Sequence, residues 1–417
     1  MRLSIVSLSV FVALLSFSSS AQIYMYTMPF EESPHEGTWL QWPHNYTYGG
    51  GAEDAEPTWV AMTEALVTGE KVHLIAYNTE EVVHINSALE EAGVAMENVD
   101  FFISPNDDYW VRDNGPIFVN NIEGELVILD WGFNGWGGDT PYELCDEIPA
   151  FVGEELGLPV VDLNAMVLEG GAFEIDGAGS MMATRSSITG NDRNPGLTEA
   201  EIEGYMTQNL GVTNFIWLDG QFGGQEDITD QHIDGFLKFH GDNTIVTMNS
   251  SDLNYWYVSA SDREIIFNAT NASGEPYNYV YLPLTQYPVT TTWGQPVGFR
   301  CTYANYYVAN TVVLVPNYDD PMDEVANGLI QELYPDRVVV GVNSRNIVLY
   351  GGMIHCVTQQ QPVPANSIGV DDIPQELPIG ELIQVLDLSG RLVGSPEKGI
   401  IYLWVYSSGR VVKAISE

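Results

Sequence analysis

Apolar runs and amphipathic stretches alternate along the middle of the chain. Apolar positions spaced by three and four residues, opened by proline or hydroxyl residues, predict helices over residues 57–69, 79–92, 198–211 and 321–333. Short apolar runs predict strands over residues 72–76, 99–103, 117–119, 214–218, 337–342 and 346–349. The recurring strand–helix–strand units indicate an α/β fold with an internal repeat.

Two regions depart from this alternation. Residues 250–295 are rich in Tyr, Asn and Thr with little helical periodicity, which predicts a strand-and-loop insertion that walls a pocket. After Gln361, prolines crowd a stretch that is typical of a linker, and the tail then has β runs over residues 383–388, 400–405 and 411–415. We predict a main domain over residues 22–362, followed by a linker and a small all-β module over residues 363–417.

The first residues have the pattern of a secretion signal. Residues 1–22 carry Arg2 as their one charge, then an apolar run and a small-residue cleavage site, so we predict a signal peptide over residues 1–21. A retained N-terminal anchor is the alternative. No later stretch reaches about 18 uninterrupted apolar residues, so we predict an exported protein with no membrane span in its mature chain.

The charge balance is strongly acidic. Asp and Glu number 57 against 14 Lys and Arg, a formal net charge of -43, which argues against binding to a phosphate backbone and therefore against a nucleic-acid partner. Solvation of the surface is one explanation, and attraction of cationic substrates is another.

The cysteine count points to a free thiol. An exported chain with three cysteines leaves at least one of them unpaired. Whether Cys145 and Cys301 form a disulfide is a question that the sequence leaves undecided. Common metal and nucleotide motifs (CxxC, HExxH and a Walker-type glycine loop) do not occur in the sequence.

Candidates for a thiol and an imidazole follow from local context. Cys356 comes after a glycine pair and a predicted strand, so its thiol would emerge at a strand end as a nucleophile; a small buried apolar residue is the alternative. On extended backbone His355 would point the opposite way, and we do not expect it to be the acid/base partner. Extended geometry would also place His232 and Asp234 on one face as a proton shuttle, with a surface loop as the alternative.

Acidic residues that suit a guanidinium lie in two other segments. A carboxylate and an aromatic face hold this planar cation well, and Asp113 with Trp110 supplies both; a structural salt bridge between Arg112 and Asp113 is the alternative. Glu169 ends an apolar run before two glycines, which fits a further cation ligand or a solvated turn residue.

Taken together, the motifs resemble the agmatine deiminase and bacterial, Porphyromonas-type peptidylarginine deiminase family of guanidine-modifying enzymes. They span about residues 25–362 and are, in order, Trp42-Pro43, Trp110-Val111-Arg112-Asp113-Asn114-Gly115-Pro116, Phe133-Asn134-Gly135-Trp136-Gly137-Gly138, Leu168-Glu169-Gly170-Gly171, Asn191-Asp192-Arg193-Asn194-Pro195, His232-Ile233-Asp234, Tyr303-Ala304-Asn305 and Gly351-Gly352-Met353-Ile354-His355-Cys356.

This resemblance implies a five-bladed, pseudo-symmetric α/β propeller of ββαβ units around an acidic pocket. It implies Cys356 as covalent nucleophile, His232 as acid and then base, and Asp113 and Asp234 as guanidinium ligands. It also implies a substrate-binding set, namely Glu169, Trp110, Asn305 and Trp136. Neither a metal nor an organic cofactor is implied.

The resemblance favours a small guanidine such as agmatine as substrate. The branch that acts on peptides uses a pair of arginines near the segment that matches residues 133–138, and this chain has none there. Two departures keep a peptidylarginine deiminase as the alternative: Gln231 replaces the usual glycine, and Arg185 offers a cation that could meet a carboxylate.

Two further expectations concern the cell surface. An inactive polyamine-binding surface protein is the second alternative, although mere binding needs the carboxylates and not the thiol. The tail resembles an abbreviated sorting domain of the type IX secretion pathway, which predicts delivery to the exterior of a bacterium.

Overall fold

Five sheets of three or four strands make up the main domain, and a sixth lies in the tail, among the residues that the structure describes. The computed structural model describes residues 25–45, 52–221 and 227–367, with residues 382–386, 393, 398, 401–406 and 411–415 of the tail. The predicted signal peptide and most of the predicted linker lie outside the described residues. The sequence-based prediction of a mixed α/β fold is confirmed.

One pairing pattern recurs in all five sheets of the main domain. Their strands, in spatial order, are β17 (Gln359–Pro362), β2 (His35–Gln41), β3 (Lys71–Ala76) and β4 (Val99–Ile103); β1 (Tyr26–Thr27), β5 (Ile117–Asn121), β6 (Leu126–Gly132) and β7 (Val160–Val167); β8 (Phe173–Ile175), β9 (Ser180–Thr184) and β10 (Asn214–Leu218); β11 (Leu237–His240), β12 (Thr244–Met248) and β13 (Asn278–Leu282); and β14 (Tyr307–Val308), β15 (Val312–Asn317) and β16 (Val338–Asn343). An antiparallel pair leads into a parallel pair each time: β17–β2–β3, β5–β6–β7, β8–β9–β10, β11–β12–β13 and β14–β15–β16.

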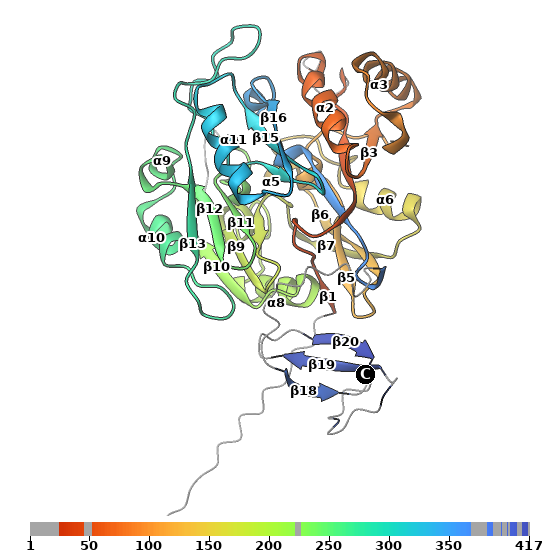
Figure 1. Cartoon of the computed structure of the whole chain (residues 1–417), viewed down its shortest axis with the longest axis vertical. Coiled ribbons are helices and arrows are strands. Elements are labelled where there is room, and N and C mark those ends of the chain that lie inside the picture. The colour runs from red at the N-terminus through yellow and green to blue at the C-terminus, as the bar shows by residue number, and fades with distance from the viewer. Residues whose placement is uncertain are drawn as a thin grey trace, which may run out of the picture.

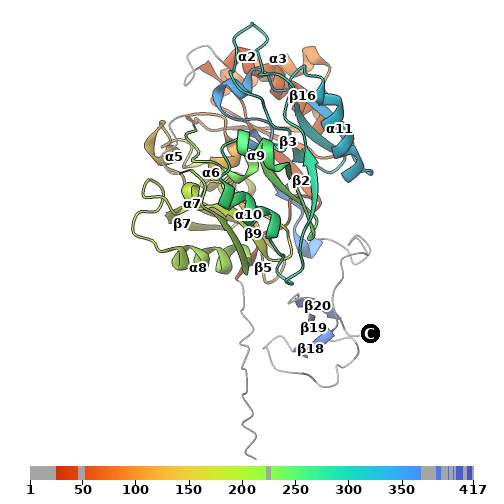
Figure 2. The same ribbon diagram turned by 90° about the vertical axis from the view of Figure 1, so that its left-hand side faces the viewer.

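Helices make the crossovers between the parallel strands, because parallel neighbours need a connection of about a dozen residues or more. The crossover helices are α2 (Ala52–Leu66), α6 (Ile148–Leu156), α8 (Glu199–Leu210), α9 (Ser250–Tyr255) with α10 (Ala260–Asn268), and α11 (Met322–Leu333). They lie toward the outside of the domain with the strands inside, as does α3 (Thr79–Ala92) between β3 and β4 (Figures 1 and 2). The shorter turns are α4 (Val111–Asn114), α5 (Gly135–Gly138), α7 (Arg185–Ile188), η1 (Met96–Asn98), η2 (Ile233–Gly235), η3 (Ile347–Tyr350), η4 (His355–Val357) and η5 (Ala365–Ser367).

Local capping explains why two predicted helices have the expected ends. Thr198 and Glu201 form the predicted capping box of α8, and Gly211 ends that helix in the left-handed region at φ 77°. The side chain of Asn78 accepts from the first backbone N–H groups of α3. The start of α2 was predicted wrongly, since this helix begins at Ala52 and contains Pro57.

Two further sequence-based predictions are wrong. Residues 250–295 contain α9 and α10 as well as β13, and side-chain caps from Asn249 and Ser259 open these helices despite their poor apolar periodicity. The predicted strand over residues 346–349 is instead the 3-10 turn η3.

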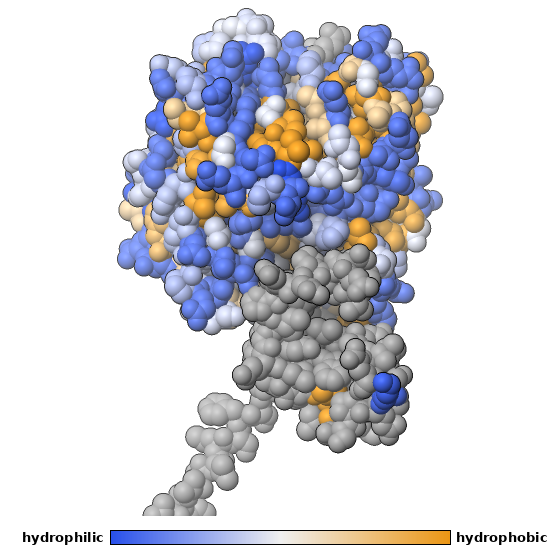
Figure 3. Space-filling view, in the orientation of Figure 1, coloured by the Kyte–Doolittle hydropathy of each residue, from blue (hydrophilic) through white to orange (hydrophobic). Residues whose placement is uncertain are grey.

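Apolar side chains fill the space between the sheets and their helices. Trp59 and Met62 of α2, for example, are fully buried in one cluster with Leu74 of β3 and Leu314 of β15. Hydrophilic residues cover much of the outer face in Figure 3, as the acidic composition requires. Among the described helices, none has the length and apolar character needed to cross a bilayer.

Three strands form an antiparallel sheet in the tail, namely β18 (Leu382–Leu386), β19 (Ile401–Tyr406) and β20 (Val411–Ile415). The division of the chain into a main domain and a sorting module stays a prediction.

Candidate functional site

The predicted site residues occupy one repeated place in the fold. Asp113 lies just before β5, Glu169 before β8, Asp234 before β11, Asn305 before β14 and Cys356 before β17. Each of these strands is the first strand of its sheet's antiparallel-then-parallel unit. Residues that are far apart in sequence therefore reach the site through equivalent connections.

Gly171 marks the point where three of these side chains converge. A Cβ atom on Gly171 would lie 2.7 Å from Nδ1 of His232, 2.8 Å from Oδ1 of Asp113 and 3.0 Å from Oδ2 of Asp234. Such contacts are too close for a side chain, so glycine is required here by space. The structure thus brings the predicted imidazole and both predicted guanidinium ligands together.

The thiol of Cys356 joins this group from η4. Its Sγ atom lies 3.6 Å from Oδ2 of Asp234 and 3.2 Å from Nδ2 of Asn305. Cys356 is partly exposed, whereas Cys145 and Cys301 are buried, and all three are free thiols in the structure. Burial, together with the charges of Asp234 and Asp113, raises the pKa of the Cys356 thiol well above its ordinary value.

The local geometry of Cys356 differs from the prediction. A 3-10 turn, and not a strand end, presents the thiol, because residues 347–350 and 355–357 both fold into 3-10 turns. The glycine before this turn has a packing role, since a side chain on Gly352 would overlap the ring of Trp110. Trp110 thereby comes close to the segment that carries the thiol.

Asp113 is held by a backbone and a side-chain donor. The N–H of Gly171 donates to Oδ1 at 3.1 Å, and Nε1 of Trp136 donates to Oδ2 at 3.0 Å. Burial raises the pKa of Asp113 to about 6, while the charge of His232 works in the other direction. The alternative of a salt bridge with Arg112 is wrong, because Arg112 instead pairs with Glu31 and Gln360.

His232 is held from the other side by Glu169. Its Nε2 lies 2.8 Å from Oε2 of Glu169, and Nδ1 lies 3.6 Å from Oδ1 of Asp113. Burial disfavours the charged imidazole, but the two carboxylates outweigh burial and raise the pKa of His232 to about 9. His232 is therefore an acid at neutral pH.

Glu169 is 1% exposed, so the alternative of a solvated turn residue is wrong. Its second oxygen accepts from Nε of Arg193 at 2.6 Å, and Arg193 also reaches Asp230 at 3.1 Å. Arg193 was not among the predicted site residues, although its place in the Asn191–Pro195 motif was a signal. Both oxygens of Glu169 thus face protein groups, which makes it a support for His232, and its contact with a substrate stays a prediction.

The backbone before His232 is strained. Asp230 and Gln231 have φ of 55° and 69°, in the left-handed region that non-glycine residues rarely adopt. Two hydroxyl groups hold this turn: Oγ of Ser186 donates to the carbonyl of Asp230 at 2.6 Å, and Oγ1 of Thr184 donates to that of Gln231 at 3.0 Å. The predicted extended geometry is wrong, since η2 follows His232 directly.

Arg185 is engaged away from this turn. Its guanidinium pairs with Glu199 at 2.6 Å and with Asp219 at 3.0 Å. The hypothesis that Arg185 meets a substrate carboxylate gains no support from this arrangement.

Within the described ranges, no three His, Cys, Asp or Glu side chains are grouped as a metal site would require.

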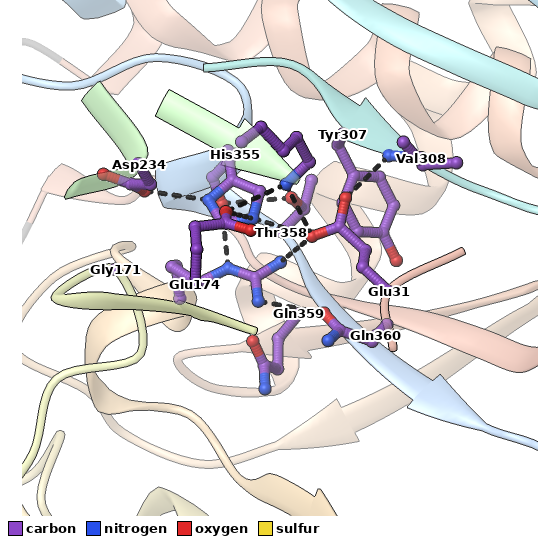
Figure 4. A network of polar contacts seen from close by, with 12 residues as sticks. Glu31, Gly171, Glu174, Asp234, Tyr307, Val308, His355, Thr358, Gln359 and Gln360 are labelled. Carbon is purple, nitrogen blue, oxygen red and sulfur yellow. Dashed lines mark hydrogen bonds and ion pairs between the residues drawn. The ribbon is translucent and has the colours of Figure 1, made fainter. Parts of the chain in front are cut away.

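A buried layer of charged residues, which no sequence pattern predicted, lies next to the site. His355 stands between Asp234 and Glu31, with Nδ1 and Nε2 each 2.8 Å from a carboxylate oxygen (Figure 4). Lys238 donates to Glu31 at 2.9 Å and to Glu174 at 3.1 Å. No local pattern announces such contacts, because Glu31 and His355 are more than 300 positions apart.

The chain is similar to known deiminases over most of its length. The model of the Porphyromonas-type peptidyl-arginine deiminase family matches residues 27–362. The agmatine deiminase of Pseudomonas syringae pv. tomato is 32% identical over 81% of this chain and 95% of that protein. The solved structure of Enterococcus faecalis agmatine deiminase has a TM-score of 0.72 at 27% identity and covers 82% of this chain and 96% of that one. A substrate-bound C. jejuni agmatine deiminase has a TM-score of 0.70 at 25% identity, covering 82% and 98%.

Proposed function

The chain belongs to the Porphyromonas-type peptidyl-arginine deiminase family, whose members are hydrolases acting on C–N bonds, and on this premise we propose that it is an exported agmatine deiminase. The reaction would convert agmatine and water into the corresponding ureido amine and ammonia. The relatives named agmatine deiminase and the substrate-bound neighbour support a small guanidine substrate.

One observation carries the proposal: a thiol, an imidazole and two carboxylates share one site. His232, Asp113 and Asp234 all border the space beside the Cα atom of Gly171, and Asp234 contacts Cys356, so the four groups lie together. Two carboxylates near a thiol suit a cationic carbon as the target, because the cation compensates their charge on binding. A site for binding alone would need no thiol.

The mechanism follows from the charges of these groups. Burial and the negative field of Asp234 and Asp113 keep the Cys356 thiol protonated. A guanidinium between the two carboxylates would offset this field, so that the thiol releases its proton to solvent when substrate is bound. The thiolate forms an S–C bond to the guanidinium carbon. His232 gives its proton to the departing nitrogen, the C–N bond breaks, and ammonia leaves from a covalent thiouronium intermediate.

Water completes the cycle. The now neutral His232 takes one proton from a water molecule, whose oxygen adds to the same carbon. The S–C bond then breaks, the second water proton passes to the departing sulfur, and the ureido product leaves with the Cys356 thiol restored. Trp136 would hold Asp113 in place through its N–H, and Asn305 would hold the sulfur. Trp110 is proposed to line the same pocket.

Peptidylarginine remains the alternative substrate, because the family's own description names it. An inactive polyamine-binding surface protein is the other alternative. The engagement of Arg185 with Glu199 and Asp219 favours agmatine, since this cation is not left over for a peptide carboxylate.

The proposal includes two further parts: the closure of the five sheets into a ring, and the export of the enzyme. The five repeated sheets support a five-bladed propeller, in which the first strands of the sheets surround the site, and the pairing of β17 with β2 would close the ring. A signal peptide over residues 1–21 and a type IX sorting tail would direct the enzyme to the cell exterior.

Ammonia release tests the proposed function. The mature protein is assayed on agmatine, on free arginine and on a peptide ending in arginine, with Cys356→Ala as the control. We expect agmatine to give the highest kcat/KM. A preference for the peptide would reassign the protein as a peptidylarginine deiminase, and release from none of the three would contradict a deiminase.

A further inference from the structure

The residues beside the site form a second charged layer, defined here as Glu31, Glu174, Lys238, His355 and Arg112. Glu174 and Lys238 are the second residues of β8 and β11. They therefore lie further along the chain than Glu169 and Asp234, which come just before these two strands. All five residues are nearly fully buried. Charges buried this deeply are costly unless they are paired, so their arrangement requires an explanation.

Glu31 is the centre of this layer. Its Oε1 accepts from the backbone N–H of Val308 at 3.0 Å, and its Oε2 accepts from Lys238 at 2.9 Å and faces Nε2 of His355 at 2.8 Å. Burial alone would raise the pKa of Glu31, but Lys238 and His355 outweigh it and hold that pKa well below its ordinary value. A charged Glu31 is thus built into the fold.

His355 connects this layer to the site. Both of its ring nitrogens face carboxylate oxygens at 2.8 Å, an arrangement that an imidazolium satisfies because both of its nitrogens donate. Nε of Arg112 donates to the backbone carbonyl of His355 at 3.3 Å, which fixes the turn. The carboxylates that face the ring are Glu31, Glu174 at 3.9 Å, and Asp234 (Figure 4). Lys238 and Arg112 lie next to them through their ion pairs with Glu31.

Resting on the proposed function, we propose that His355 is a positioning residue that keeps the Asp234 carboxylate charged and oriented for the substrate, and that Glu31 anchors His355. The oxygen of Asp234 that His355 holds, Oδ2, is the one 3.6 Å from the sulfur of Cys356. Burial by itself would raise the pKa of Asp234, but the hydrogen bond and charge of His355 bring it below its ordinary value. His355 therefore acts through Asp234 and need not touch the substrate.

The test compares four variants of the full-length mature protein with the wild type. His355→Ala removes both ring contacts, whereas His355→Asn keeps an N–H donor near the place of Nδ1. Glu31→Gln removes the anchoring charge and keeps its shape. His73→Asn is the matched control, because His73 is also buried and lies 2.9 Å from a carboxylate, that of Glu36.

Two readouts are measured, and the first needs no substrate. Carboxyl carbon NMR, with the Asp234 signal assigned by its loss in Asp234→Asn, follows the titration of Asp234. The second readout is kcat/KM for agmatine as a function of pH.

We expect His355→Ala to move the Asp234 titration to higher pH and to raise KM by about 10- to 100-fold, the range seen when a ligand of a metal site loses its supporting hydrogen bond. The acidic limb of kcat/KM, whose position Asp113 sets, should become steeper as the Asp234 titration approaches that of Asp113. His355→Asn should restore part of the loss, Glu31→Gln should shift the titration in the same direction by less, and His73→Asn should leave it unchanged.

An Asp234 titration that coincides with that of the wild type in His355→Asn and Glu31→Gln would overturn the positioning role, even if His355→Ala does not fold. Failure of the wild type to release ammonia would contradict the proposed function instead. The NMR titration still decides the role of His355 in that case.

Discussion

The Nε2 atom of His232 lies 2.8 Å from Oε2 of Glu169, a carboxylate that is itself held by Arg193 at 2.6 Å. This chain of contacts fixes the ring on the side away from Asp113. It also keeps a proton on the imidazole at neutral pH, where a free histidine would have lost most of it. The site is therefore set for an acid step before a base step.

The pH dependence of kcat/KM should be bell-shaped. Asp113, with a pKa of about 6, must be ionised to bind the cation, so activity should fall as the pH drops below that value. His232, with a pKa of about 9, must be protonated for the first step, so activity should fall above that value. Each limb should approach a slope of about tenfold per pH unit. A pH-independent rate between pH 5 and 10, measured with agmatine, would contradict these assignments.

Glu169→Gln should move the basic limb to lower pH. The negative charge of Glu169 favours the imidazolium, so its removal lowers the pKa of His232, and a single nearby charge shifts a pKa by about 1 to 3 units. The measurement is the pH profile of kcat/KM. Glu36→Gln, which removes the carboxylate beside His73, is the matched control and should leave the basic limb in place. Equal shifts in both variants would mean that the effect is nonspecific.

Cys356→Ala should abolish turnover and keep the fold. The substitution removes the nucleophile without adding a charge, and the loss of a covalent nucleophile lowers kcat by about 10⁴-fold or more. Agmatine binding by calorimetry should persist, because Asp113 and Asp234 remain. Measurable turnover at the wild-type rate would sink the covalent mechanism, and circular dichroism checks that the variant is folded.

The Gln231→Gly variant should be more stable toward unfolding than the Gln231→Ala variant. Both Gln231→Gly and Gln231→Ala lose the side-chain contact with the carbonyl of Trp256, so their difference isolates the backbone. At φ 69° a Cβ atom costs about 1 to 2 kcal/mol, which glycine avoids. The free energy of unfolding from urea titration should therefore favour glycine by about 1 kcal/mol. If the alanine variant has the higher free energy of unfolding, as it would on ordinary backbone, the turn is not left-handed in solution.

Much of the fold could be predicted from the sequence because its signals are local. The bounds of α3, β4 and β10 coincide with the predicted ranges, since apolar periodicity, Asn78 and Gly93 act within a few residues of one another. Helices α9 and α10 were not predicted, because side-chain caps mark where they begin and no stripe of apolar residues runs along them. The turn η3, which precedes the Cys356 segment, was predicted as a strand because a short apolar run is compatible with a strand or a 3-10 turn.

The sequence by itself also determined the chemical types in the site: a thiol, an imidazole and carboxylates suited to a cation. Only the tertiary structure decided which partners each of them has. In the structure, Glu169 contacts His232, and Arg112 pairs with Glu31 and not with Asp113. His355 lies beside Asp234. The physical reason is that these contacts join segments from different sheets, whose distance and charge depend on packing that no local pattern records.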